Sequence, residues 1–370
     1  IKKFHKNVIF IKVKDTRSKL AEIASKFYKT KPKNIVAVTG TNGKTSISDF
    51  FHQIFTLNKK SVGSLGTLGL KKNNKLKIRN LTTLDTLNLH KDLYEMKNSN
   101  IDNVILEASS HGLKQKRLDF LKIKAGIFTN LSHDHLDYHE NMNDYFNSKL
   151  LLFKKLLKKK SSIITDSNIK QYKVLKKIQK KRKLKIYTIG SRGNTLQILN
   201  HKIYKDHQFL EIKIRNKIYG IKVNLYGSIQ IKNLLMAVLA SKICGLKIDK
   251  IFRNIQKIKS VEGRLELIKT LPNQTKVFLD YAHTPDALEN AILSLREHFN
   301  KNITVIFGCG GDRDKGKRKL MGIIAKKYCD KIYVTDDNPR NENPKSIRKE
   351  ILKHCSNGIE ISDRKLAIKI

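Results

Sequence analysis

With 370 residues, the chain is longer than one ordinary domain and can bury a sizeable core, so we expect two domains. The formal net charge of +44 comes from lysines spread along the whole chain, which indicates a general compositional bias and argues against a nucleic-acid-binding protein. No apolar run reaches the roughly 18 residues of a membrane span, no signal peptide is visible, and the four cysteines lack metal-binding spacing, which together favour a cytoplasmic protein with reduced cysteines.

Residues 1–33 are too few to form a domain of their own. They contain a predicted strand at Val8–Val13 and a predicted helix at Arg17–Tyr28. Because the chain begins at Ile1 rather than Met, we expect this segment to be the remnant of an N-terminal domain, followed by a linker.

The glycine-rich stretch NIVAVTGTNGKTS, which begins at Asn34, predicts a phosphate-binding loop. A predicted buried strand at Ile35–Thr39 precedes the turn, and a helical run at Ile47–Leu57 follows it. Backbone N–H groups and the positive end of the helix dipole favour an anion in such a turn. Lys44 would reach the β- and γ-phosphates of a nucleotide and Thr45 would offer its hydroxyl to Mg²⁺, in a shorter variant of the general P-loop pattern.

Strands and helices alternate from residue 34 to 260, which predicts an α/β domain with a mostly parallel sheet. Predicted strands at Asn103–Glu107 and Ala125–Thr129 end in polar residues, and open α/β sheets bind ligands outside the carboxyl ends of their strands. Glu107 and His135 lie just past these ends and could hold Mg²⁺, although histidine is an unusual ligand for that ion. The alternative is that the histidines of this loop are ordinary polar residues.

Lys149 is expected on the apolar face of a helix from Met142 to Leu157, near Tyr145 and Phe153. Burial would lower the pKa of its amine and favour the neutral form. A neutral amine can take up CO₂ as a carbamate, which would turn a cation into an anionic ligand for Mg²⁺. Helical geometry alone favours the alternative, a lysine whose ammonium group reaches solvent.

A group of polar residues before and after Glu107 is suited to a carboxylate-bearing substrate. It combines hydroxyl, amide and guanidinium groups, and a guanidinium can bind a carboxylate in bidentate fashion. Each residue alone would be ordinary surface chemistry. The group consists of Thr82, Thr83, Ser109, Gln115 and Arg117.

Short alternating segments at 186–226 predict antiparallel strands, and an amphipathic helix at Gly227–Ile243 is expected to close the central domain. From residue 261 to 370 the pattern restarts as a second doubly wound α/β domain, which we expect to be cut at its end because another helix begins at Arg364. Its predicted strands are Lys276–Tyr281, Ile303–Phe307 and Lys331–Thr335, and its predicted helices are Pro285–His298, Leu320–Tyr328 and Pro344–His354.

Two loops of the second domain predict another anion site. The loop GCGGDRDKGKR carries Arg313, and the loop DNPR carries Arg340 beside Asp337 and Asn338, which could bind an ammonium group. Asp280, Tyr281 and His283 follow the domain's first predicted strand and could face the nucleotide.

Nine motifs in this order resemble those of the Mur ligases of peptidoglycan synthesis, from about residue 17 to the end of the chain. They are TGTNGKTS, LTTLDTLNLH, EASSHGL, TNLSHDHLDYH, YFNSKLLLF, VEGRLELI, DYAHTPDAL, FGCGGDRDKGKR and DDNPR. The resemblance implies an ATP-dependent amide ligase. ATP would phosphorylate the D-glutamate γ-carboxylate of a UDP-muramoyl dipeptide, and an amine of meso-diaminopimelate would attack the acyl phosphate.

The resemblance also implies roles for individual residues. The phosphates of ATP would be bound by Gly40, Thr41, Asn42, Gly43, Lys44 and Thr45, with Asn233, Arg264, Asp280 and His283 near the adenosine. Mg²⁺ would be held by Thr45, Glu107, His135 and a carbamate on Lys149. At Lys149 the resemblance therefore favours the carbamate, whereas helical geometry alone favours an ammonium group that reaches solvent. The UDP-muramoyl dipeptide would contact Thr82, Thr83, Ser109, Gln115 and Arg117, and diaminopimelate would contact Arg313, Asp337, Asn338, Pro339 and Arg340.

Three positions depart from the family pattern, namely Leu84, Gln230 and Glu262, and put local loop shape and adenine contacts in question. The alternatives are a lysine-adding sister ligase, a folylpolyglutamate synthase, a non-catalytic remnant and, more remotely, a basic nucleic-acid-binding P-loop protein. An arginine at position 340 argues against lysine as substrate, because the lysine side chain has no distal carboxylate for it to meet. We expect a monomer that acts on small molecules and binds neither nucleic acid nor membrane.

Overall fold

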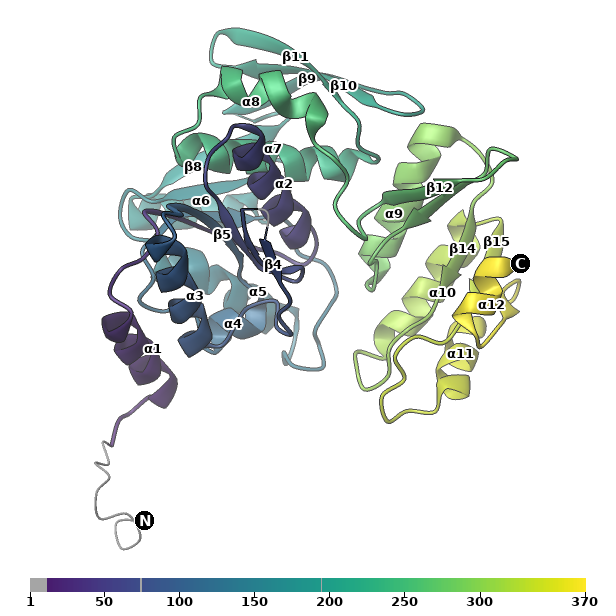
Figure 1. Cartoon of the computed structure of the whole chain (residues 1–370). Coiled ribbons are helices and arrows are strands. Elements are labelled where there is room, and N and C mark those ends of the chain that lie inside the picture. The colour runs from purple at the N-terminus through teal and green to yellow at the C-terminus, as the bar shows by residue number, and fades with distance from the viewer. Residues whose placement is uncertain (1–11, 74, 194) are drawn as a thin grey trace, which may run out of the picture.

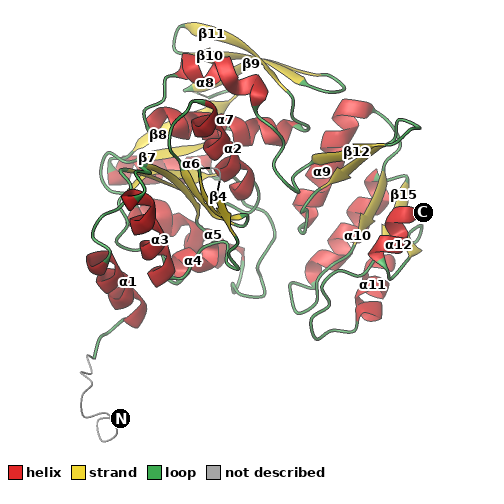
Figure 2. Cartoon of the chain, in the orientation of Figure 1, coloured by secondary structure: helices red, strands yellow, loops and turns green. Residues whose placement is uncertain are grey.

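The structure is a computed structural model that describes residues 12–73, 75–193 and 195–370. The strand predicted at Val8–Val13 lies almost wholly outside the described residues, whereas the helix predicted after it is present as α1 (Thr16–Phe27). Figures 1 and 2 show a central part built on one large sheet and a smaller C-terminal part beside it. Within the described ranges, no helix combines the length and the apolar character needed to cross a membrane.

The central part is built around β1 (Asn34–Thr39), which is buried along its whole length. It pairs in parallel with β5 (Asn103–Glu107) on one side and with β6 (Ile123–Phe128) on the other. In the described residues this sheet has eleven strands, in the order β11-β10-β9-β8-β7-β6-β1-β5-β2-β3-β4. The others are β2 (Gly63–Gly66), β3 (Gly69–Lys72), β4 (Lys75–Lys77), β7 (Ser162–Asp166), β8 (Lys185–Gly190), β9 (Leu196–Ile203), β10 (Gln208–Ile214) and β11 (Lys217–Val223).

Helices cover both faces of this sheet. Alternate residues of β1 point to opposite sides and are apolar on both, so each face needs a covering layer. Val36 and Val38 join one apolar core, and Ile35 and Ala37 join the other. The first face carries α2 (Lys44–Leu57), α7 (Ser228–Ile243), α8 (Ile248–Asn254) and the short 3₁₀ helix η2 (Ile255–Lys257). The second face carries α3 (Thr86–Asn98), α4 (Ser110–Lys114), α5 (Met142–Leu151), the π-helical turn η1 (Leu152–Leu156) and α6 (Tyr172–Arg182).

The antiparallel strands predicted within 186–226 are confirmed as β9, β10 and β11. Two helix predictions need correction. The helix predicted from Met142 to Leu157 is α-helical only to Leu151, after which the chain continues as η1. The helix predicted at Gly227–Ile243 is not amphipathic: most of α7 is buried, because it packs both against α2 and against strands β7 and β8 of the sheet, and its polar residues Asn233 and Ser241 are buried too.

The C-terminal part has two small sheets rather than one. The strand predicted at Lys276–Tyr281 is β13 (Lys276–Leu279), and it pairs antiparallel with β12 (Glu266–Thr270), a strand that the sequence pattern did not predict. The strands β14 (Thr304–Phe307), β15 (Lys331–Val334) and β16 (Ile359–Glu360) form a parallel sheet. The accompanying helices are α9 (Pro285–Phe299), α10 (Gly316–Tyr328), α11 (Pro344–Leu352) and α12 (Arg364–Lys369).

Candidate active site

The predicted phosphate-binding loop links the end of β1 to the start of α2. Lys44 is the first residue of α2, and its Nζ donates to the carbonyl oxygens of Gly40 (3.0 Å) and Thr41 (2.7 Å). Burial lowers the pKa of Lys44, while the nearby Glu107 carboxylate opposes that shift. Gly43 has a φ of 88°, and a Cβ there would lie 2.6 Å from Oδ1 of Asn233, so only glycine fits. The side chain of Asn233, on α7, therefore packs directly against the loop at Gly43.

Glu107 ends β5 beside this loop and is 2% exposed. Its Oε2 accepts from the Thr45 hydroxyl at 3.3 Å, and its Oε1 accepts from the Thr67 N–H at 2.9 Å. Burial raises the pKa of Glu107, whereas Lys44 lowers it. A buried carboxylate next to a hydroxyl offers the oxygen donors that Mg²⁺ prefers, and a bound cation would offset the cost of burying the charge.

Two side chains of α5 hold the loop from the other side of the sheet. Lys149 is 1% exposed, so the prediction that it points inward is confirmed, and its Nζ donates to the Gly40 carbonyl oxygen at 2.8 Å. Burial, reinforced by the charge of Lys44, brings the pKa of Lys149 well below its ordinary value. The Tyr145 hydroxyl lies 3.2 Å from the Thr41 hydroxyl.

The loop after β6 brings His135 to this region. His135 has a left-handed backbone (φ 56°), and its Nε2 lies 3.2 Å from Oδ2 of Asp134. Burial lowers the pKa of His135 to about 4, so at neutral pH its imidazole is uncharged and free to act as a ligand. In the described part of the chain, no three His, Cys, Asp or Glu side chains form a ready-made metal cluster. A Mg²⁺ ion here would therefore keep several water ligands, as it commonly does.

The five residues predicted to bind a carboxylate-bearing substrate lie together beside Glu107. The Thr83 hydroxyl accepts from the Ser109 N–H at 2.9 Å, and Arg117 donates through Nη1 to the Thr83 carbonyl oxygen at 2.6 Å. The guanidinium of Arg117 also donates to Oε1 of Gln115 at 2.6 Å. The Thr82 hydroxyl lies 3.1 Å from the hydroxyl of Thr67, which contacts Glu107 in turn.

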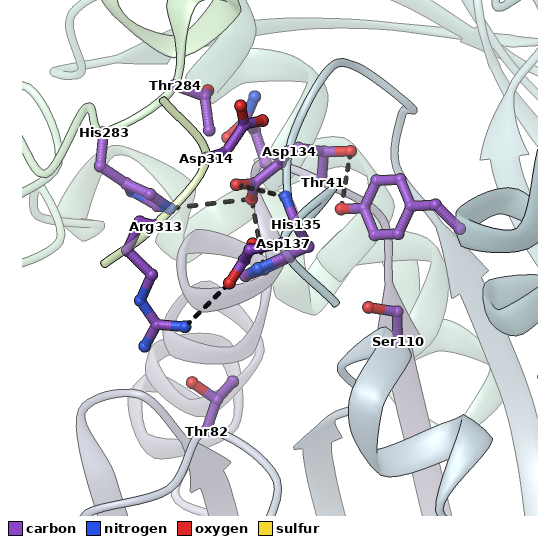
Figure 3. Close-up of polar contacts among 12 residues, drawn as sticks. Thr41, Thr82, Ser110, Asp134, His135, Asp137, His283, Thr284, Arg313 and Asp314 are labelled. Atoms are coloured by element: carbon purple, nitrogen blue, oxygen red, sulfur yellow. Dashed lines mark hydrogen bonds and ion pairs between the residues drawn. The ribbon is translucent and has the colours of Figure 1, made fainter. Parts of the chain in front are cut away.

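Residues of the C-terminal part reach the loop after β6 (Figure 3). Arg313 donates to Oδ2 of Asp137 at 3.2 Å, and Nε2 of His283 lies 3.9 Å from Oδ2 of Asp134. Two further pairs cross the same boundary: His133 with Asp314 at 2.6 Å, and Asn42 with Asp286 at 2.8 Å. Asp134, Asp137 and Asp286 are absent from the predicted site. All three belong to motifs quoted for the resemblance, the first two to TNLSHDHLDYH and Asp286 to DYAHTPDAL, and could have been selected on that ground.

The two predicted anion-binding loops of the C-terminal part contact each other. Arg340 donates through Nη1 to the Gly311 carbonyl oxygen at 2.6 Å, and the Gly311 N–H donates to the Asn338 carbonyl oxygen at 2.9 Å. Asp337 lies 3.9 Å from the guanidinium of Arg364.

The predicted adenosine residues of the C-terminal part lie at the boundary with the phosphate-binding loop. Arg264 packs over the ring of Tyr281, 4.5 Å from its centroid, and donates to the Thr45 hydroxyl at 3.4 Å. Asp280 accepts from the Leu265 N–H at 2.7 Å, which fixes the chain just after Arg264.

Comparisons with known proteins match both parts of the chain. The Mur ligase middle domain matches residues 38–241, and the glutamate ligase domain of Mur ligases matches residues 263–370. A relative from Chelativorans sp. (strain BNC1) is 40% identical over 359 residues, which are 97% of this chain and 74% of that protein. It is named UDP-N-acetylmuramoyl-L-alanyl-D-glutamate–2,6-diaminopimelate ligase.

Solved structures agree with these matches. A structure with the same ligase name has a TM-score of 0.68 and 30% identity, and covers 94% of this chain and 72% of its own. A Mycobacterium tuberculosis folylpolyglutamate synthase complexed with ADP has a TM-score of 0.79 at 16% identity, with coverage of 96% and 86%. At that identity the second likeness is one of fold alone.

Proposed function

Because the chain belongs to the Mur ligase family, we infer that it joins meso-diaminopimelate to the D-glutamate γ-carboxylate of UDP-N-acetylmuramoyl-L-Ala-D-Glu. It is an ATP-dependent amide ligase of peptidoglycan precursor synthesis, and it uses Mg²⁺. The observation that carries this function is 40% identity, over nearly the whole chain, to a ligase named for that reaction. We place the enzyme in the cytoplasm and expect it to act as a monomer.

The reaction needs charge neutralisation and positioning more than covalent chemistry by the protein. The γ-carboxylate takes the terminal phosphoryl group of ATP, the amine of diaminopimelate attacks the resulting acyl phosphate, and phosphate leaves as the amide forms. Lys44, at the start of α2, can place its charge on the transferred group, and Arg264 adds a second charge beside Thr45. Mg²⁺, held through Thr45, Glu107 and His135, would neutralise phosphate charge.

Lys149 is proposed to carry a carbamate. Its amine is buried and held close to Gly40, and its lowered pKa favours the neutral form that reacts with CO₂. The carbamate would place an anion next to Lys44, whose own charge would stabilise it, and would offer a further oxygen ligand to Mg²⁺.

The substrate contacts are proposals as well. The cluster at Thr83, Ser109 and Arg117 suits the UDP-muramoyl dipeptide, because it presents hydroxyls and a guanidinium next to Glu107. Arg313 and the loop Asp337–Arg340 suit diaminopimelate, since they offer two guanidinium groups together with acceptors for an ammonium group.

The experiment that tests the function follows phosphate release by the purified full-length gene product with ATP, Mg²⁺ and UDP-N-acetylmuramoyl-L-Ala-D-Glu. Meso-diaminopimelate or L-lysine is added in parallel, and the variant Lys44→Ala supplies the background. Release with diaminopimelate alone is the expected result. Release with lysine instead would retain the ligase but overturn the role given to Arg340, and release with neither from folded, ATP-binding protein would reject the function.

A further inference from the structure

We propose that His139 is a positioning residue, whose ring sets the place of α4, which is capped by the proposed substrate residues Ser109 and Gln115, and of the lysine-bearing helix α5 through two separate hydrogen bonds. His139 is 1% exposed and lies four residues after His135, in the loop that follows β6. The proposal rests on the proposed ligase function, because its kinetic consequences are read in that reaction.

Both ring nitrogens of His139 have side-chain partners. Nδ1 lies 3.0 Å from Oδ2 of Asp144, and Nε2 lies 3.0 Å from the hydroxyl of Ser110. A carboxylate can only accept, so Nδ1 carries the proton and donates to Asp144, which leaves the second bond to Nε2 and the Ser110 hydroxyl. Asp–His–Ser contacts of this kind also occur in hydrolases, but Ser110 is itself 1% exposed and has no access to a substrate.

The Ser110 bond fixes the start of α4. Ser110 is the first residue of that helix and directly follows Ser109, whose hydroxyl accepts from the Gly112 N–H at 3.1 Å as the N-cap. Ser109 in turn contacts Thr83, the residue to which Arg117 donates. A shift at Ser110 therefore moves residues that we assign to the UDP-muramoyl dipeptide. Figure 3 shows Ser110 on the short helix below the loop that carries His135.

The Asp144 bond fixes the first turn of α5. Asp144 also accepts from Nζ of Lys114 at 2.7 Å, so it ties the far end of α4 to the same turn. The next residue, Tyr145, contacts Thr41, and Lys149 lies about one turn further along and contacts Gly40. Replacing the His139 ring leaves the Lys114–Asp144 pair in place, so the loss of the ring's bond to Asp144 should act mainly on the phosphate-binding loop.

The backbone of His139 holds a third element. Its N–H donates to the His135 carbonyl oxygen at 3.0 Å, which closes the turn in which His135 has its left-handed conformation. Replacing the side chain leaves this backbone bond in place, so side-chain variants report on the contacts of the ring, which lie mainly with α4 and α5.

Two conservative variants separate the two ring bonds. The amide of His139→Asn takes the place of Nδ1 and keeps the Asp144 bond, whereas the amide of His139→Gln reaches the place of Nε2 and keeps the Ser110 bond. We expect His139→Asn to raise KM for the UDP-muramoyl dipeptide about fivefold with kcat nearly unchanged, the value of one lost neutral hydrogen bond. We expect His139→Gln to leave that KM nearly unchanged and to lower kcat by about tenfold or more, because the bond it loses goes to a charged carboxylate.

Ser110→Ala is the matched control, since it removes the same bond from the other partner. It should raise the same KM as His139→Asn does, and the double variant should add nothing further. Equal changes in KM and kcat for the Asn and Gln variants, or additive effects in the double variant, would overturn the proposal. So would wild-type kinetics in all three variants with only the melting temperature lowered.

Amide hydrogen exchange on the free protein makes the test independent of the substrate. His139→Asn should speed exchange in residues 110–114 and His139→Gln in the first turn of α5, even if the ligase assay fails for every protein including the wild type. An inactive wild type with this pattern would reject the function and leave the positioning role standing. An active wild type whose variants lack this exchange pattern would support the ligase function and reject the positioning role of His139.

Discussion

Arg313 donates to Asp137 at 3.2 Å, across 176 positions of the sequence, and the pair links the C-terminal part to the loop after β6 (Figure 3). The side chains are 48% and 24% exposed, so the pair contributes only about 0–1 kcal/mol to stability. We propose that the same guanidinium binds a carboxylate of diaminopimelate. Under that proposal, Arg313 has two separable partners, Asp137 in the protein and a carboxylate in the substrate.

Substitutions on the two sides of this pair are predicted to differ in their effect on KM for diaminopimelate. Arg313→Ala should raise that KM by about tenfold or more, the value of a hydrogen bond to a charged group, whereas Asp137→Asn should change it by less than about threefold. Steady-state phosphate release at varied diaminopimelate measures both. Equal effects would mean that Arg313 serves only to hold the two parts together.

Gly227→Ala is predicted to destabilise the contact between α9 and the start of α7. Gly227 has a φ of 82°, its N–H donates to Nε2 of His298 at 3.0 Å, and an added Cβ would lie 2.6 Å from the hydroxyl of Ser294. Gly245→Ala is the control, because its φ of 109° brings similar backbone strain but no atom lies within 4 Å. We expect about 1 kcal/mol of lost unfolding free energy at Gly245 and about 1–3 kcal/mol more at Gly227. Urea unfolding of both variants measures the difference, and equal losses would contradict the role given to Ser294.

Local patterns predicted the elements that carry the site. The apolar run before the glycine-rich turn specified β1, and the helical spacing of Lys149 from Tyr145 and Phe153 placed that lysine on the inner face of α5, as the structure confirms. Helical geometry alone favoured an amine that reaches solvent, and that preference was wrong, because Lys149 is buried. The outcome depends on the carbonyl of Gly40, which is 109 positions away.

Features that depend on long-range packing were not predictable. The polar residues of α7 made it look amphipathic, yet the Ser241 hydroxyl donates to the Ala237 carbonyl oxygen within the helix and Asn233 donates to Gln230, so these residues are buried with partners. The contacts of Asp134 with His283, of Asp137 with Arg313 and of Asp286 with Asn42 exist only because the C-terminal part lies against the loops that follow β1 and β6. No local pattern encodes that placement.

Glu107→Gln is predicted to raise the Mg²⁺ concentration that half-saturates the reaction by at least about tenfold, since it removes a charged oxygen donor beside Thr45. The neutral amide can still accept from the Thr67 N–H, so the fold should be retained. Activity titrated with Mg²⁺ measures the effect, and Glu95→Gln, a partly exposed change on α3, is the control. An unchanged Mg²⁺ requirement would remove Glu107 from the proposed metal site.

Lys149→Met is predicted to abolish ligase activity and yet to stabilise the protein in CO₂-free buffer at pH 7. The pKa of Lys149 is lowered well below its ordinary value of 10.5 by burial and by Lys44, so folding at neutral pH must remove a proton that the unfolded chain keeps. Between the lowered pKa and 10.5 the unfolded state binds more protons, and the stability of the wild type therefore rises with pH across this window. Methionine has no proton to lose and does not share this dependence.

The melting temperature of Lys149→Met should therefore exceed that of the wild type at pH 7, and the gap should narrow as the pH approaches 10.5. Added bicarbonate at pH 8 should raise the melting temperature of the wild type but not that of Lys149→Met, because a carbamate relieves the cost of the buried amine next to Lys44. Lys155→Met is the control, because Lys155 is an exposed lysine of η1 on the same face of the sheet as Lys149. It should follow the wild type in both tests. A gap that does not change with pH would mean that Lys149 keeps an ordinary charged amine, and the proposed carbamate would then lose its chemical basis.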